Sequence, residues 1–120
     1  MSSELCRRAA QAFINALLCY LRSNAMRTLK IASLTGQNKV RVSLRAFMRC
    51  HDTSSGFDKI EEVVNTLTKC SESSWIHKLG WDYVFEGNEL YFIIPLDGFK
   101  KLTEVREKEL MSTLLRVLGF

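Results

Sequence analysis

Basic side chains recur at alternate positions between residues 39 and 49, in the segment KVRVSLRAFMR. In an extended segment, every second side chain points to the same face. Regularly spaced arginines neutralise phosphates, and an aromatic ring among them gives a base a surface on which to stack. The pattern therefore predicts a surface that holds a nucleic-acid backbone. With the basic residues of the preceding segment, the expected binding residues are Arg7, Arg8, Arg22, Arg27, Lys30, Lys39, Arg41, Arg45, Phe47 and Arg49.

The charge is distributed unevenly along the 120 residues of the chain. Residues 1–50 carry nine Lys or Arg and one Glu, a formal charge of +8, and no acid occurs from Leu5 to Cys50. Residues 51–120 carry eight basic and twelve acidic residues, a formal charge of −4, which gives the whole chain its net +4. An acid-free half of this length favours a polyanionic partner over simple solvation of the basic side chains.

Side chains suited to catalysis or metal binding are few and scattered. Cys50, His51, Cys70 and His77 could in principle surround a zinc ion. Structural zinc sites, however, usually use pairs of ligands two to four residues apart, and the gaps from His51 to Cys70 and His77 are longer. The sequence also has no Gly-rich phosphate loop. We therefore expect no enzyme activity, no metal and no cofactor.

The four cysteines, at positions 6, 19, 50 and 70, form no Cys-x-x-Cys pair. In the absence of a secretory signal, we expect them to be reduced and largely buried thiols. The apolar run after Arg7 and Arg8 is interrupted by Gln11 and Asn15, so it predicts neither a signal peptide nor a membrane span. The expected location is cytoplasmic or nucleoid-associated, without membrane contact.

The elements that position the basic residues begin with a helix predicted over residues 3–22. Its polar residues fall on one narrow stripe, so the rest of the domain or a second copy must cover its apolar circumference. A period of two after Thr28 predicts a hairpin around the turn TGQN, with a second strand through Arg49. In an alternative assignment only residues 40–42 form a strand, and Ser43 is the N-cap of a short helix through Cys50. The sequence leaves residues 43–50 open between strand and helix.

Apolar spacings of three and four predict a helix over residues 57–70 that packs by one face. The segment WDYVFEGNELYFII then predicts a hairpin with a Gly-Asn turn, which places Phe85 opposite Leu90 and Tyr83 opposite Phe92. We expect the aromatic face of this hairpin to line the core, because burying each such side chain contributes about 1.5 to 3 kcal/mol. The opposite face carries acids.

A last helix is predicted over about 98–118, with Asp97 as its cap and Gly119 as its stop. The charged turn REKE at residues 106–109 interrupts its apolar stripe. This interruption suggests that the apolar end of the helix leaves the domain and packs on a partner subunit. We therefore expect a homodimer or a subunit of a larger assembly.

Together these elements predict one α+β domain over residues 1–120, ordered helix, hairpin, helix, hairpin, helix, with helices covering an antiparallel sheet. The order and the basic surface resemble single-stranded-DNA-binding proteins of thermophilic archaea that lack the usual barrel fold. The expected function is non-enzymatic binding of single-stranded DNA or RNA, in a basic groove between the first hairpin and the first helix.

Under the alternative assignment, residues 39–94 give a short strand, two helices and a hairpin. This order resembles a winged-helix domain with extra helices at its ends. The resemblance implies that the helix over residues 57–70 enters the DNA major groove. That helix carries Asp58, Glu61 and Glu62, and the hairpin turn is flanked by Glu86 and Glu89, all of which repel phosphates. A winged helix that contacts protein fits these acids better.

Overall fold

The computed structural model describes residues 3–71 and 74–120 and confirms an α+β fold. Its elements are α1 (Ser3–Thr35), β1 (Lys39–Ser43), η1 (Leu44–Cys50), η2 (Thr53–Ser55), α2 (Ile60–Cys70), α3 (Trp75–Lys78), β2 (Asp82–Glu86), β3 (Glu89–Pro95), α4 (Leu96–Glu104) and α5 (Glu107–Val117). The labels η1 and η2 denote 3₁₀-helices. The strands form an antiparallel sheet of order β1-β3-β2, so β1 and β2 are its edges. Within the described ranges, no helix has the length and apolarity to cross a membrane.

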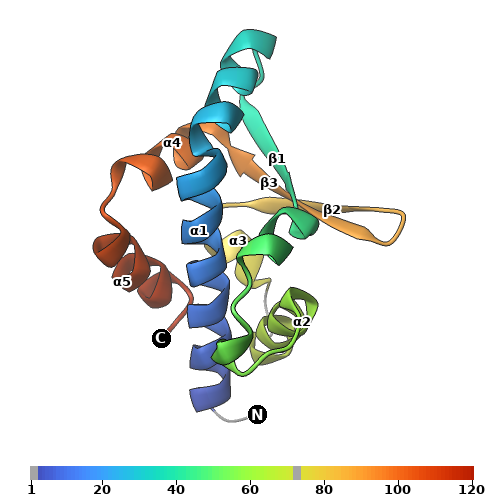
Figure 1. Cartoon of the computed structure of the whole chain (residues 1–120), viewed down its shortest axis with the longest axis vertical. Coiled ribbons are helices and arrows are strands. Elements are labelled where there is room, and N and C mark those ends of the chain that lie inside the picture. Colours follow the sequence, from blue (N-terminus) through green and yellow to red (C-terminus); the bar gives the residue numbers. More distant parts are fainter. Residues whose placement is uncertain (1–2, 72–73) are drawn as a thin grey trace.

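Helix α1 is the central element of the molecule (Figure 1). Helices α4 and α5 lie on one side of it, and α2, α3 and the sheet lie on the other (Figure 1). Phe13, Ile14 and Leu17 are each only 1% exposed, as a nearly all-round apolar helix requires. The apolar surface of this helix over residues 3–22 is therefore packed against the rest of its own chain, and not against a second copy.

The first predicted hairpin is not formed, because residues 28–35 continue α1. Leu29 and Ala32, three positions apart, both pack against the core, a spacing that suits a helix. The helix ends at Gly36, whose φ of 67° is readily adopted only by glycine. The alternation of apolar and polar residues predicts a strand here, but packing of the long helix on the core overrides this local pattern.

Residues 43–50 follow the alternative assignment, in which Ser43 caps a short helix. Strand β1 ends at Ser43, and η1 begins at the next residue. The Ser43 hydroxyl accepts a hydrogen bond from the Arg45 N–H at 3.1 Å, which satisfies a backbone donor at the start of the helix. The prediction of a strand that continues to Arg49 was therefore wrong.

The second hairpin has the predicted register, with Phe85 opposite Leu90 and Tyr83 opposite Phe92. Strand β1 pairs with the other edge of β3, where Val42 also lies opposite Phe92. Phe92 is completely buried, so the middle of the sheet is a wall of the core. The prediction of a core-lining aromatic face holds for β3 but not for β2, whose five residues are all exposed.

The predicted C-terminal helix is broken at Val105 and Arg106 into α4 and α5, and Pro95, not Asp97, is the N-cap of α4. Helix α5 folds back against α1 (Figure 1). Its apolar residues Leu110 and Leu114 are 4% and 7% exposed. The chain therefore bends just before the charged segment, whose Glu107 begins α5, and this bend lets α5 pack on its own chain instead of leaving the domain.

The cysteines form two disulfides, Cys6–Cys70 and Cys19–Cys50, and are not the reduced thiols that we predicted. Each bridge fastens α1 to the last residue of a later helix, α2 or η1. The Cα atoms are 5.9 Å and 5.7 Å apart, within the usual range for a disulfide. The sequence did not reveal the pairing, because the partners meet only when α2 and η1 fold back onto α1.

Removing either disulfide should lower the free energy of unfolding by about 3 to 5 kcal/mol, because each bridge restricts the unfolded chain. The bridges join residues 64 and 31 positions apart, so Cys6→Ser/Cys70→Ser should cost slightly more than Cys19→Ser/Cys50→Ser. The measurement is denaturant unfolding followed by circular dichroism. A loss below about 1 kcal/mol in both variants would contradict the expected stabilisation.

Candidate functional site

The fold divides the predicted basic surface into separate parts. Arg22, on α1, binds Glu107 at the start of α5, with Nη1 3.0 Å from both carboxylate oxygens. Arg8 lies 3.5 Å from Glu4, one turn away on the same helix. Arg22 therefore has a carboxylate partner from a distant part of the chain, whereas the Arg8–Glu4 pair is long and exposed.

Arg41 and Arg45 face the acidic hairpin turn. Arg41 forms an ion pair with Glu86, and its guanidinium carbon lies 3.9 Å from the centroid of the Tyr91 ring, a cation–π contact. The hydrogen bond between Arg41 and Glu86 raises the pKa of the arginine and lowers the pKa of the carboxyl group. Arg45 Nε lies 3.5 Å from Glu89 Oε1. These pairs fasten β1 and η1 to the hairpin.

Phe47 is not available for stacking on a base, so this predicted role was wrong. Its ring is completely buried, with its centroid 5.3 Å from that of Tyr20, 5.6 Å from Phe13 and 5.7 Å from Phe92. In a strand, Phe47 and the neighbouring arginines would share one face. In η1 the backbone turns, and the ring points into the core while Arg45 and Arg49 remain exposed.

Three of the remaining basic residues lie near the junction between the end of α1 and the start of β1. Arg27 and Lys30 are exposed on the last turns of α1, and Lys39 is exposed at the start of β1. None of the three forms an ion pair within the part of the chain that the structure describes. The turn between them adds the exposed amides of Gln37 and Asn38, which line a shallow hollow of about 460 Å³. We call these five residues the basic end.

Arg7 and Arg49 lie away from the basic end. Arg7 is exposed near the start of α1, about 30 Å along the helix from Arg27. Arg49 is exposed on η1, beside the cysteine that is bonded to Cys19 in the middle of α1. The structure therefore does not unite all the predicted residues in one groove.

The residues considered for zinc are also separated. Cys50 and Cys70 belong to different disulfides. His51 Nε2 lies 2.6 Å from the carbonyl oxygen of Phe57, and His77 Nε2 lies 3.3 Å from Asp82 Oδ1. Among residues 3–71 and 74–120, no group of three or more His, Cys, Asp or Glu residues could hold a metal.

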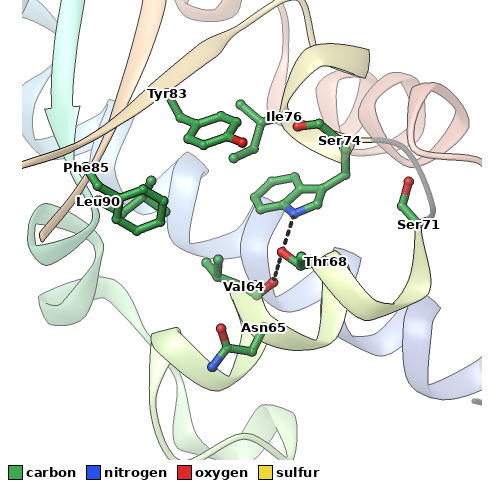
Figure 2. A pocket seen from close by; sticks show the side chains of 10 residues that line it. Val64, Asn65, Thr68, Ser71, Ser74, Ile76, Tyr83, Phe85 and Leu90 are labelled. Atoms are coloured by element: carbon green, nitrogen blue, oxygen red, sulfur yellow. Dashed lines mark hydrogen bonds between the residues drawn. The ribbon is translucent and has the colours of Figure 1, made fainter. Parts of the chain in front are cut away.

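An apolar groove that sequence reasoning missed lies between β2 and the helices α2 and α3 (Figure 2). Its volume is about 400 Å³. The indole N–H of Trp75 donates a hydrogen bond to Thr68 Oγ1 at 3.2 Å, so its donor is used within the groove wall. The lining residues are Val64, Asn65, Thr68, Ser71, Ser74, Trp75, Ile76, Tyr83, Phe85 and Leu90.

Aromatic side chains that we expected in the core stand open on this groove. Tyr83 is 39% exposed and Phe85 is 62% exposed, and their ring centroids lie 6.0 Å apart, edge to face. Helix α3 has only four residues and does not cover the strand toward its turn. The signal available in the sequence was the position of these rings beside the turn, where a hairpin extends beyond the helices that cover its base. Exposed apolar surface of this kind marks an interaction site.

Phe47→Ala should lower the free energy of unfolding by about 3 to 5 kcal/mol, because it leaves a cavity in the aromatic core. Arg49→Ala, on the exposed side of the same short helix, is the matched control and should change stability by no more than about 0.5 kcal/mol. Urea unfolding measures both values. Equal small effects in the two variants would contradict the burial of Phe47.

The hairpin ion pairs predict a loss of stability in acid. The pKa of Glu86 is lowered by its hydrogen bond with Arg41, and that of Glu89 by its hydrogen bond with Ser43. Both carboxylates therefore stabilise the fold fully above about pH 5, and this contribution is lost as the pH falls below about 4. Glu86→Gln/Glu89→Gln should show a shallower decline of unfolding free energy between about pH 5 and 3. Parallel declines in the variant and the wild type would contradict the ion pairs.

Comparison of the chain with protein-family models, curated proteins and solved structures finds no match. The likeness to a winged-helix domain thus depends on the order of elements alone. The features of the chain that suit binding are the basic end, the groove and the charges around them.

Proposed function

We propose that this protein binds nucleic acid without catalysing a reaction, with single-stranded DNA or RNA as the favoured ligand. The observation that carries the proposal is the basic end, where Arg27, Lys30 and Lys39 are exposed without ion-pair partners among the described residues. Exposed basic side chains without ion-pair partners can neutralise phosphates and release counterions, although Lys39 also interacts electrostatically with Asp82. Gln37 and Asn38 add hydrogen-bonding groups that suit the edges of unstacked bases.

Acidic side chains on the other surfaces favour a single strand over a duplex. Helix α2, which a winged-helix protein would present to the major groove, carries the acids Glu61 and Glu62 in its first turn. The hairpin turn is flanked by Glu86 and Glu89. A duplex that followed the winged-helix arrangement would meet these carboxylates, whereas a flexible strand can contact the basic end without approaching them.

A cytoplasmic or nucleoid-associated location stays a prediction. Disulfides are typical of oxidising compartments, and they also occur in intracellular proteins of hyperthermophiles. Because the chain has two disulfides, the predicted location inside the cell fits a hyperthermophile, in which intracellular proteins carry disulfides.

Protein binding on the side of α2 and the hairpin is a second candidate function, favoured by the apolar groove. The order of elements from β1 to β3, with β1 beside β3, is compatible with the winged-helix alternative. The helix that would read DNA in that arrangement presents acids, and the groove next to it is lined by Tyr83, Phe85 and Trp75. Such a groove suits an apolar segment of a protein better than a phosphate backbone.

Arg27→Glu/Lys30→Glu should weaken binding of a labelled single-stranded oligonucleotide by about tenfold or more at about 100 mM salt. Replacing basic contacts with acids removes counterion release and adds repulsion. The measurement is fluorescence anisotropy across a salt series, in which the variant should also show a smaller salt slope.

Lys100→Glu/Lys101→Glu is the matched control, because it makes the same change of charge at exposed positions of α4. It should retain most of the binding. An equal loss in both variants would mean that net charge, and not the basic end, determines affinity. No binding by the wild type at low salt would overturn the proposed function.

A further inference from the structure

We propose that this protein associates with a second copy of itself by docking the exposed face of the end of α1 in the apolar groove between β2 and α2. The inference rests on the second candidate function, protein binding by the groove, and names the partner. Each copy carries both surfaces, so each can donate a helix end and receive one. Nucleic acid is not required for this contact.

The end of α1 carries an apolar face that its own chain leaves open. Met26, Ile31 and Leu34 are 82%, 53% and 77% exposed. Together with Arg27 and Lys30, they lie within about 140° of the helix circumference, because successive residues are about 100° apart. Apolar anchors three to four positions apart on one helical face are the pattern that docks in a groove.

The groove continues beyond its aromatic end. Leu90 also lines a second hollow of about 600 Å³, whose apolar walls include Leu44 and Met48. Met48 is 52% exposed, so this apolar surface is open as well. Leu90 thus joins the rings of β2 to the side chains of η1. The two hollows together offer apolar walls for more than one side chain of an incoming helix.

The charges of the two surfaces are complementary. Three carboxylates, from Glu61, Glu86 and Glu89, line the second hollow, against the single guanidinium of Arg45. Although Glu86 and Glu89 have arginine partners, Glu61 forms no ion pair within the described residues. A second copy would bring two cations, Arg27 and Lys30, beside its apolar anchors. Acids at a rim and bases on the incoming helix favour this encounter and its orientation.

The contact must join different copies. Helix α1 is continuous to Thr35, and its end lies at the opposite part of the molecule from α2 (Figure 1). It therefore cannot bend back into the groove of its own chain without breaking the helix. The helix end and the groove remain unpaired with each other in one chain and can pair between chains.

Sedimentation velocity of the full chain over a concentration series, without nucleic acid, tests the inference. The wild type should form a larger species as concentration rises. Ile31→Ser/Leu34→Ser, at the helix end, and Tyr83→Ser/Phe85→Ser, in the groove, should each weaken association by about tenfold or more, because each removes apolar anchors. These side chains are substantially exposed, so circular dichroism should show a retained fold.

An equimolar mixture of the two deficient variants should recover a two-chain species. In that mixture, the intact helix end of the groove variant can dock in the intact groove of the helix-end variant. Val105→Ser/Val117→Ser is the matched control, since both valines are exposed outside the two surfaces, at 39% and 41%. This control should associate like the wild type.

Failure of the mixture to recover association, or an equal loss in the valine control, would overturn the inference. A wild type that stays monomeric at its highest soluble concentration would overturn it too. That last result excludes a second copy as the occupant of the groove, but it leaves protein binding by the groove intact, because that function does not require the partner to be this chain.

Discussion

The fold depends on burying the first half of α1, a helix that is apolar around most of its circumference. Phe13 is at the centre of this burial, with ring centroids of four other aromatic residues 4.9 to 6.2 Å away. Those rings come from η1, α3, β3 and the residue before β2, so one side chain unites elements that are distant in sequence. The disulfides add covalent links from the same helix to α2 and η1. Helices α2, α4 and α5, the 3₁₀-helix η1 and strand β1 contact α1 directly, whereas β2 is held by β3 and α3.

The surfaces proposed for binding lie where α1 and the hairpin extend beyond the elements that pack on them. Helix α1 has 33 residues, and beyond Ala25 no element that the structure describes covers its outward face, so Met26 and Leu34 are exposed beside Arg27 and Lys30. The hairpin likewise extends past the short α3, and Phe85 is left open. Because Arg27 and Lys30 belong to both the basic end and the docking face, one helix end cannot hold nucleic acid and a second copy at the same time.

The spacing of apolar residues predicted an element correctly where it matched only one kind of secondary structure. The register of the β2–β3 hairpin followed from its Gly-Asn turn, and the helix around Ile60–Cys70 followed from its apolar stripe. Prediction was wrong where tertiary contacts decided between two local patterns. Leu29 and Ala32 suit a helix, but the alternation around them suggested a strand. Ser43 could continue a strand or cap a helix, and this choice alone moved Phe47 from a binding surface into the core.

Contacts between distant residues could not be read from the sequence. The disulfides, and the ion pairs of Arg22 with Glu107 and Arg41 with Glu86, form only after the chain has folded. These ion pairs changed the candidate site most, because they removed arginines from an otherwise regular basic run. The sequence showed only the total charge of residues 1–50. The structure was needed to show which of these basic side chains form ion pairs and which do not.

Hydrogen exchange along α1, followed by mass spectrometry of the dilute protein, tests the central claim that this helix has a buried half and a free end. Amides of residues 9–21 should exchange last, at the rate of global unfolding, and those of residues 26–35 should exchange much earlier through local opening. Uniformly slow exchange from residue 9 to residue 35 would contradict the account. It would mean that the end of α1 opens only when the whole fold opens, and not as a separate, less stable part of the helix.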